Sequence, residues 1–209
     1  MQYRFITIEG NIGAGKTTLA TVLAEELNAR LILEAFSDNP FLPKFYANPA
    51  QYAFPLELFF MAERFKQLKE ILQPDMFHQT VISDYLFTKC LLFAKVNLPE
   101  EEFKLYQRLF DIILQQLLLP DILIYLHAPV EKLQQNIHRR QRSYEQQIPD
   151  SYLHDIQKTY LNYLQQQNLP TLLVDASNAD FTGNPAQVQV LLRALDKPYA
   201  AGIHRILLP

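Results

Sequence analysis

Residues 8–19 read IEGNIGAGKTTL, a run whose glycine content is unlike that of the rest of the chain. The preceding run, residues 3–9, is apolar and predicts a strand, and the pattern that follows predicts a helix over residues 15–28. Three of the five glycines in the chain lie in the turn between them: Gly10, Gly13 and Gly15. Glycine takes positive φ angles and lets the backbone come close to a ligand, so the run predicts a binding turn.

The spacing Gly-x4-Gly-Lys-Thr in this turn is the complete pattern of a phosphate-binding P-loop, and it lies in the right context between a strand and a helix. Backbone N–H groups cradle the phosphates, Lys16 reaches the β- and γ-oxygens, and Thr17 holds Mg²⁺. A plain turn with a capping threonine is the alternative, but it needs neither the lysine nor three glycines. The residues expected to bind ATP here are Gly10, Asn11, Ile12, Gly13, Ala14, Gly15, Lys16, Thr17 and Thr18.

Short β-rich runs alternate with longer stretches of helical period along the whole chain. This alternation predicts βαβ units, and therefore one α/β domain over residues 1–209 with a parallel sheet and helices on both faces. Most predicted strands end in a carboxylate, and ligands of such sheets bind beyond the carboxyl ends of the strands. The predicted strands are residues 3–9, 30–34, 80–84, 121–128 and 171–176. The predicted helices are residues 15–28, 53–73, 100–118, 130–141, 150–167 and 185–195.

Composition and charge narrow the class of protein further. No apolar run reaches the roughly 18 residues of a membrane span and the N-terminal residues carry no secretion signal, so we expect no membrane partner and a cytoplasmic location. The single cysteine, Cys90, is expected to be a packing residue. The net charge of -3 argues against a broad nucleic-acid surface. The scattered histidines show no metal spacing, so Mg²⁺ carried by ATP is the metal we expect.

Two further segments, residues 31–68 and the run HRRQRSYEQ at 138–146, resemble the deoxynucleoside kinase family, and most of all its purine-preferring bacterial members. The resemblance covers residues 3–181. It implies a P-loop kinase fold with a five-stranded parallel sheet, an arginine-rich lid at about 138–150, and a homodimer. It also implies transfer of the γ-phosphoryl group of ATP to the 5'-hydroxyl of a deoxyribonucleoside, dG or dA favoured, in nucleotide salvage. The segment 196–209 matches nothing in the family and is expected to be a peripheral tail.

The resemblance implies roles for residues that bind the acceptor. Glu34 ends the second predicted strand, is followed by SDNPF at 37–41, and matches the glutamate that serves as general base for the 5'-hydroxyl. Tyr46 matches a tyrosine that hydrogen-bonds the sugar 3'-hydroxyl, and Arg64 matches an arginine beside the base and the catalytic carboxylate. Glu57 lies seven residues before Arg64, so both face one side of a helix. The alternatives are a solvated strand-end carboxylate for Glu34 and an exposed Glu57–Arg64 ion pair.

Glu57 is a departure from the family pattern, which commonly has glutamine at this position. A glutamine offers one donor and one acceptor to the base, whereas an ionised glutamate only accepts. Guanine presents two adjacent donors, N1–H and the 2-amino group, which a carboxylate accepts as a pair. We therefore expect the replacement to favour deoxyguanosine, with deoxyadenosine close behind through a water or a protonated Glu57.

The third predicted strand carries a second departure. Family members have Asp/Glu-Arg-Ser here, with the acid near Mg²⁺ and the arginine near the reacting phosphates, whereas this chain reads ISDYLFTK at residues 82–89. Asp84 supplies the acid, but Tyr85 cannot replace a guanidinium, so the source of one positive charge is open. Alignment through LLFAK at residues 91–95 shifts Asp84 onto the arginine position, which leaves its role ambiguous by one residue. The same alignment matches Phe93 to an aromatic that stacks on the base; a core residue is the alternative.

The run HRRQRSYEQ matches the arginine-rich lid of the family. Arg140 and Arg142 flank Gln141, where the family usually has glycine, and two guanidinium groups there can stabilise the equatorial oxygens of the transferred phosphoryl group. Glu145 matches a lid carboxylate that reaches the 3'-hydroxyl. A solvated charged face is the alternative. Two residues near the chain's end match a loop that contacts the adenine of ATP: Asp180 and Phe181.

Two other functions fit parts of the sequence. A nucleoside monophosphate kinase such as thymidylate kinase has the same fold and loop, but it needs basic residues for the acceptor's phosphate, whereas Glu34 and Glu57 would repel one. A nucleotide-binding regulator without turnover is compatible with Gln141 and the missing arginine. The residues expected to act in catalysis are Glu34, Lys16, Arg140, Arg142 and Asp84; those expected to bind the substrate are Tyr46, Glu57, Arg64, Phe93 and Glu145; the expected Mg²⁺ ligands are Thr17 and Asp84.

Overall fold

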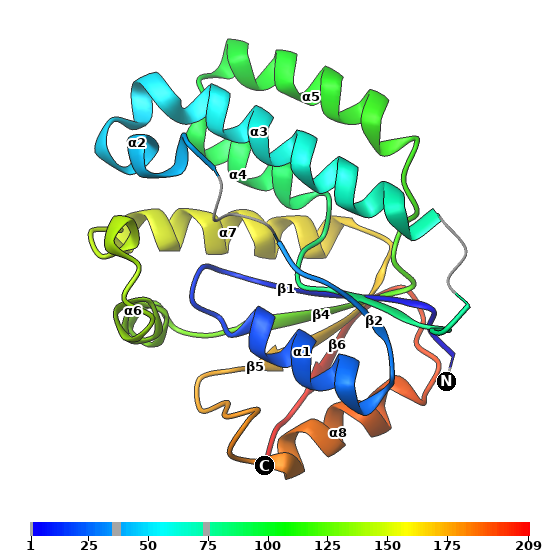
Figure 1. The fold of residues 1–209 in the computed structure, drawn as a ribbon. Helices are drawn as coiled ribbons and strands as arrows, with labels where there is room; N and C mark the ends of the chain where they lie inside the picture. Colours follow the sequence, from blue (N-terminus) through cyan, green and yellow to red (C-terminus); the bar gives the residue numbers. More distant parts are fainter. Residues whose placement is uncertain (1, 35–38, 73–75) are drawn as a thin grey trace.

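The protein is described by a computed structural model that covers residues 2–34, 39–72 and 76–209. These residues form one parallel sheet of six strands in the order β2-β3-β1-β4-β5-β6 (Figure 1). The strands are β1 (Phe5–Gly10), β2 (Arg30–Ile32), β3 (Val81–Ser83), β4 (Ile122–His127), β5 (Pro170–Asp175) and β6 (Gly202–Ile206). The predicted α/β class with a parallel sheet is confirmed.

Helices cover both faces of the sheet, as the apolar strands require. The α-helices are α1 (Lys16–Glu26), α2 (Leu42–Ala47), α3 (Pro49–Lys69), α4 (Lys89–Asn97), α5 (Glu100–Leu114), α6 (Val130–Arg139), α7 (Asp150–Gln166) and α8 (Pro185–Leu195). Two short 3-10 helices are η1 (Glu70–Leu72) and η2 (Ser143–Glu145). In Figure 1, α1 and α8 lie on one side of the sheet, and α3, α4, α5 and α7 lie on the other. Every residue of β1 is buried, because both of its faces are covered.

The predicted five-stranded sheet is wrong by one strand. The sixth strand, β6, lies in the segment 196–209 that was expected to be a peripheral tail, and it pairs with β5 from Pro170–Gly202 to Val174–Ile206. The sequence pattern hid it because β6 is an edge strand with a histidine and an arginine among five residues, and none of its residues is fully buried. Backbone pairing with β5, rather than an apolar face of its own, keeps it in the sheet.

The helix predictions miss two helices and misplace several helix ends; the helix predicted at 100–118, for example, ends at Leu114. The predicted set lacks α2 and α4, which are short helices of six and nine residues. The helix predicted at 53–73 begins earlier, at Pro49, and residue 73 lies outside the described residues. Ser37 and Asp38 of the SDNPF run also lie outside the described residues.

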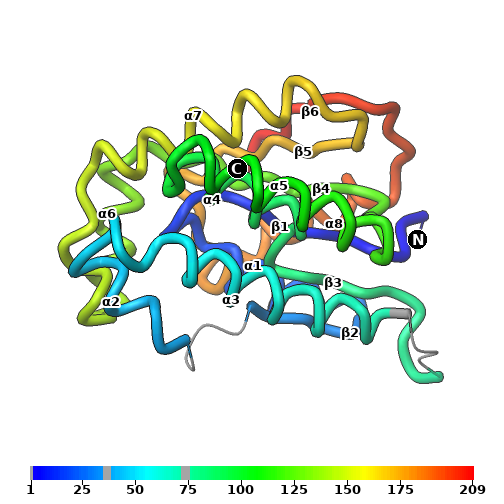
Figure 2. Tube along the Cα trace, turned by 90° about the horizontal axis from the view of Figure 1, so that it is seen from above, coloured from blue at the N-terminus to red at the C-terminus, as the bar shows by residue number. Residues whose placement is uncertain are grey.

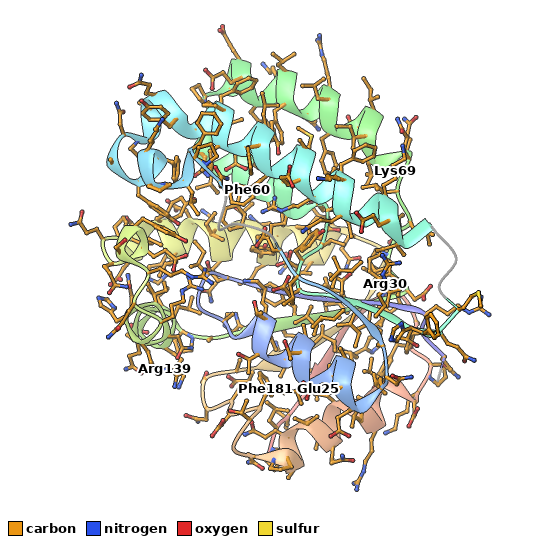
Figure 3. All side chains as sticks on the ribbon, viewed as in Figure 1. Glu25, Arg30, Phe60, Lys69, Arg139 and Phe181 are labelled. Carbon is orange, nitrogen blue, oxygen red and sulfur yellow. The ribbon has the colours of Figure 1, made fainter. Side chains whose placement is uncertain are left out.

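The strands all run towards the same end of the molecule, where α2 and α6 lie in both Figure 1 and Figure 2. Side chains fill the layers above and below the sheet, and Phe60 projects from α3 into the upper one (Figure 3). No helix in the described part of the chain is both long and apolar enough to cross a membrane. The end at which α2 and α6 lie is the carboxyl end of the parallel strands, where a ligand site was expected.

Candidate active site

The glycine-rich loop (residues 10–17) joins β1 to α1 in a conformation that its glycines dictate. Gly13 has φ +81°, and a Cβ there would lie 2.7 Å from the backbone oxygen of Leu133. Gly15 has φ +91° and immediately precedes the first residue of α1. An L side chain at either position would be strained, so the turn requires glycine at both positions.

Lys16 and Thr17 extend the loop towards its neighbours. The Lys16 ammonium donates hydrogen bonds to the backbone oxygens of Gly10 (3.0 Å) and Asn11 (2.9 Å). Burial, and next the charge of Lys89, lower the pKa of Lys16 to about 8. Thr17 Oγ1 donates to Asp84 Oδ2 at 2.6 Å. A lysine ammonium and a hydroxyl–carboxylate pair thus meet at the N-terminus of α1.

Glu34 lies just after β2 and is held by two cations. Its Oε1 accepts from Arg64 Nε at 2.8 Å and from Arg64 Nη2, and its Oε2 accepts from Lys89 Nζ at 2.6 Å. The side chains of Arg64 and Lys89 are only 3% and 7% exposed. Burial alone would raise the pKa of the Glu34 carboxyl, but the charges of Lys89 and Arg64 and their hydrogen bonds hold it well below its usual range. Glu34 is therefore an ionised carboxylate at neutral pH.

Asp84 lies beside Thr17 and Glu34 rather than among the base-binding residues. Besides accepting from Thr17, its carboxylate accepts from the backbone N–H of Glu34 at 2.7 Å. Tyr85 is completely buried, and its hydroxyl donates to Gln67 Oε1 at 2.8 Å. Asp84 therefore has the surroundings of the acid in the predicted motif, and Tyr85 brings no charge to the site.

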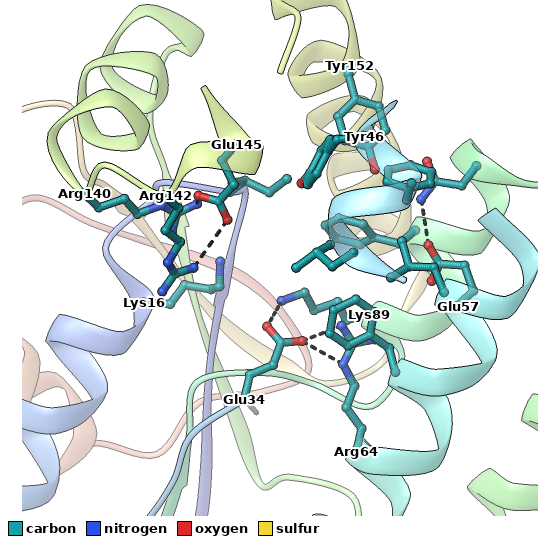
Figure 4. A pocket seen from close by; sticks show the side chains of 17 residues that line it. Lys16, Glu34, Tyr46, Glu57, Arg64, Lys89, Arg140, Arg142, Glu145 and Tyr152 are labelled. Atoms are coloured by element: carbon teal, nitrogen blue, oxygen red, sulfur yellow. Dashed lines mark hydrogen bonds and ion pairs between the residues drawn. The ribbon is translucent and has the colours of Figure 1, made fainter. Parts of the chain in front are cut away.

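One pocket joins the glycine-rich loop to α3 and α4 (Figure 4). In this view Lys16, Arg140 and Arg142 lie on one side and Glu57 lies on the other, with Glu34 between them. The predicted site residues that line the pocket are Ile12, Lys16, Glu34, Tyr46, Glu57, Arg64, Phe93, Arg140, Arg142 and Glu145. The structure thus brings together the residues predicted to bind the substrate, from segments as far apart in the chain as Tyr46 and Glu145.

Glu57 is a buried carboxylate at the far end of this pocket. It is 2% exposed, and its Oε1 accepts from Asn97 Nδ2 at 2.7 Å. Burial raises the pKa of Glu57 to about 7, although the Asn97 hydrogen bond and the charges of Arg64 and Lys89 act in the opposite direction. Glu57 therefore changes its charge near neutral pH. The alternative of an exposed Glu57–Arg64 ion pair is excluded, because both side chains are buried.

Arg140 and Arg142 follow α6 and close the pocket on the loop side. Glu145 forms ion pairs with both, through Arg140 Nη2 and, at 3.4 Å, through Arg142 Nη1. Gln141 has φ +54°, the left-handed region that favours glycine, which accounts for the glycine usual at this position. Across the pocket, the ring of Tyr46 stacks on Tyr144 with the centroids 6.2 Å apart. Both arginines therefore line the pocket and pair with the buried Glu145, while their side chains stay 31% exposed to solvent.

Most of the remaining predicted ATP residues line two hollows beside this pocket. One is lined by Gly13, Ala14, Gly15, Lys16, Thr17 and Thr18 together with Arg140 and Arg142. The other is lined by Ala14, Gly15 and Thr18 together with Asp180 and Phe181. The Asp180 carboxylate accepts from Gly183 N (2.9 Å) and Thr182 Oγ1 (3.2 Å) in its own turn. The Asn11 side chain is turned inward and donates to Leu153 O at 2.8 Å. The Asp180 carboxylate is thus engaged within its own turn, and Asn11 is not among the residues that line either hollow.

Among the pocket residues that sequence reasoning missed, two bind the predicted site carboxylates: Lys89 pairs with Glu34 and Asn97 with Glu57. Both lie on α4 with Phe93 between them, at a spacing of four residues, so all three face the pocket together. The four-residue spacing of these side chains could have indicated a shared helix face, but only if residues 89–97 had been predicted to be helical. Within the described residues, no group of three or more His, Cys, Asp or Glu side chains forms a metal cluster of its own.

Comparison with known proteins agrees with this geometry. The family model described as "Deoxynucleoside kinase" matches residues 6–197. The chain is 37% identical over 193 residues to the deoxyguanosine kinase of Bacillus subtilis, covering 88% of this chain and 92% of that protein. It is 31% identical over 192 residues to the deoxyadenosine/deoxycytidine kinase of the same organism, covering 88% of each chain.

A solved structure has the same fold. The structure of deoxyadenosine kinase from M. mycoides with bound dCTP matches with a TM-score of 0.80 and 25% sequence identity, covering 92% of this chain and 98% of that one. The match of the family model over most of the chain, together with these relatives, shows that the chain belongs to the deoxynucleoside kinase family.

Proposed function

We propose that this kinase transfers the γ-phosphoryl group of ATP to the 5'-hydroxyl of deoxyguanosine, and less efficiently to that of deoxyadenosine, in nucleotide salvage. The observation that carries the proposal is the pocket in which the ionised Glu34 lies between the glycine-rich loop and the buried Glu57 (Figure 4). The cationic side chains on the loop side can bind a triphosphate, the buried Glu57 on the other side can bind a base, and the Glu34 carboxylate lies between them.

On the donor side, the glycine-rich loop acts as a P-loop whose N–H groups bind the β-phosphate of ATP. The Thr17 hydroxyl and the Asp84 carboxylate, 2.6 Å apart, are hard oxygen donors of the kind that Mg²⁺ prefers. Mg²⁺ bound with ATP neutralises charge on the β- and γ-phosphates. Lys16 lies beside these groups and adds a positive charge to the same end of the pocket.

In the reaction, Glu34 accepts a hydrogen bond and then the proton from the 5'-hydroxyl, whose oxygen attacks the γ-phosphorus in line while the bond from that phosphorus to the β–γ bridging oxygen breaks and ADP leaves. Arg140 and Arg142 act as a lid and stabilise the charge on the equatorial oxygens. Tyr46 and Glu145 bind the 3'-hydroxyl of the sugar, and Phe93 stacks on the base. Most of the rate acceleration then comes from positioning and fixed charge.

Preference for deoxyguanosine rests on Glu57. Its carboxylate accepts from guanine N1–H and the 2-amino group, while Asn97 fixes the carboxylate through Oε1. The name of the Bacillus subtilis relative, deoxyguanosine kinase, supports the same acceptor.

The Glu57→Gln variant is expected to lower the dG:dA ratio of kcat/KM by about 10- to 100-fold, because an amide offers only one acceptor to guanine and restores a donor for adenine. Glu63→Gln, on the same helix but outside the pocket, is the matched control and should leave the ratio unchanged. An unchanged ratio in Glu57→Gln would refute the role of Glu57.

The dG:dA ratio is also expected to rise by about tenfold between pH 6 and pH 8. The pKa of Glu57 is raised to about 7, so its carboxyl is largely neutral at pH 6 and can pair with adenine, and is ionised at pH 8 and only accepts. The groups facing it are Asn97, Arg64, Lys89 and Glu34. Steady-state assays with both nucleosides across this range test the prediction. A pH-dependent ratio that persists in Glu57→Gln would assign the effect to another group.

The test of the proposed function is a transfer assay with radiolabelled ATP and Mg²⁺ against dG, dA, dC, dT and the corresponding 5'-monophosphates. Labelled nucleoside monophosphate, with dG used best, supports the proposal. Transfer to monophosphates alone would instead establish a thymidylate-kinase-like activity, and ATP binding without transfer would establish a regulator. The homodimer that the resemblance implies and the cytoplasmic location expected from the composition stay predictions.

A further inference from the structure

The site contains a lysine at an electrostatically unfavourable position. Lys89 is the first residue of α4, where the helix dipole disfavours a positive charge, and its side chain is 7% exposed. A buried ammonium needs a partner to offset the loss of its hydration. The partner is Glu34, whose Oε2 lies 2.6 Å from Lys89 Nζ.

The two cations beside Glu34 hold different oxygens of the carboxylate. Arg64 donates through two nitrogens to Oε1, and Lys89 donates to Oε2. Arg64 is itself anchored by a 3.0 Å contact from Nη1 to Cys90 Sγ. Removing Lys89 would leave the carboxylate held at Oε1 only, with the hydrogen bond that orients Oε2 lost.

Lys89 also lies in the part of the site that lacks the positive charge of the family's arginine. The residue after Asp84 is Tyr85, which is buried against Gln67 and does not line the pocket. The Lys89 charge reaches the donor side as well, since it is one of the groups that lower the pKa of Lys16. Lys89 Nζ further lies 5.5 Å from the centre of the Phe93 ring, the proposed stacking partner of the base.

We propose that Lys89 is the positioning residue of Glu34: it fixes the second carboxylate oxygen towards the 5'-hydroxyl and supplies, from the start of α4, the positive charge that Tyr85 does not. This inference rests on the proposed function of Glu34 as the base. The missing positive charge is thereby assigned to a lysine at the start of α4, and not to an arginine directly after the acid as in the family motif.

The test compares Lys89→Met, Lys89→Arg and Lys89→Ala with the wild-type kinase, using dG as acceptor. Lys89→Met is expected to lower kcat by about 100-fold while KM for dG changes little, because the carboxylate is misplaced and not the nucleoside. Lys89→Arg keeps a cation that reaches Oε2 and is expected to recover most of the activity. Lys95→Met, which removes an exposed lysine from the same helix, should behave as wild type.

Chemical rescue separates a charge role from a packing role. Adding ethylammonium to Lys89→Ala is expected to restore kcat in a saturable manner, because the cation can enter from the pocket and pair with Glu34 Oε2. Propanol, of similar size but neutral, should not restore it. Rescue by both compounds, or by neither when Lys89→Arg is also inactive, would overturn the proposal and leave Lys89 a structural residue.

The outcomes distinguish this inference from the function on which it rests. A wild-type protein that phosphorylates dG while Lys89→Met keeps a normal kcat overturns the role of Lys89 and leaves the proposed function standing. A wild-type protein that phosphorylates no nucleoside overturns the proposed function and the inference with it. Thermal unfolding curves of Lys89→Met and Lys89→Ala, with the assays run well below both transitions, confirm that the comparison concerns folded protein.

Discussion

Replacing Glu34 with glutamine is expected to lower kcat for deoxyguanosine by about 100- to 10,000-fold, the range that a positioned general base contributes. The amide has nearly the same shape as the carboxylate but cannot accept the proton of the 5'-hydroxyl. It also removes the charge to which Arg64 and Lys89 donate their hydrogen bonds. The loss is therefore expected in kcat, with a smaller change in KM for the nucleoside.

Because Glu34→Gln leaves two buried cations without their anion, a loss of stability must be separated from a loss of catalysis. Glu34→Asp serves this purpose: it keeps the negative charge but draws the carboxylate back by one methylene, and should unfold close to the wild type while remaining strongly impaired. Glu25→Gln, an exposed glutamate on α1, is the control. Single-turnover rates measured well below the unfolding temperature decide the matter. A variant that changed KM alone would make Glu34 a binding residue.

The double variant Arg140→Gln/Arg142→Gln is expected to lower kcat by about 1,000-fold or more, the magnitude of an arginine that stabilises phosphoryl transfer. Both guanidinium groups line the pocket that holds Lys16 and Glu34, and also the hollow formed by the glycine-rich loop. Neutral amides in their place cannot offset the charge that spreads over the equatorial oxygens. Since this charge develops in the transition state, kcat should fall more than the affinity for ATP.

Steady-state kinetics with varied ATP and fixed saturating dG measure this effect. The single variants are informative because Glu145 pairs with both arginines. When one arginine is replaced, the remaining arginine alone pairs with Glu145 and is therefore less available to bind phosphate. Non-additive losses are therefore expected. Arg108→Gln, an exposed arginine on α5, is the control for a simple change of net charge. A raised KM for ATP at unchanged kcat would limit the pair to ground-state binding of the nucleotide.

The glycine-rich loop was predictable from the sequence because its conformation is decided locally. Gly13 and Gly15 adopt φ values that other residues rarely take, and the run that contains them lies between an apolar strand and a helix. The class of fold followed from the same kind of local pattern, since β1 and β4 are apolar runs covered on both faces. An edge strand such as β6 lacks that pattern, because only its backbone pairing holds it.

The composition of the pocket was predictable only in part. Glu34, Tyr46, Glu57 and Arg64 were named through a family resemblance, and the structure brings them together in one pocket. The sequence alone could not resolve which family position Asp84 matches, because its partners Thr17 and Glu34 lie 67 and 50 residues away in the chain.

The sequence by itself determined the glycine-rich loop, the alternation of strands and helices, and the presence of carboxylates where strands end. Only the tertiary structure decided that Lys89 meets Glu34, that Asn97 holds Glu57, and that Tyr85 turns into the core. The physical reason is that φ angles and apolar periodicity are properties of neighbouring residues. The partner of a buried charge, in contrast, is chosen by whichever segment the packing of the helices brings within hydrogen-bond distance.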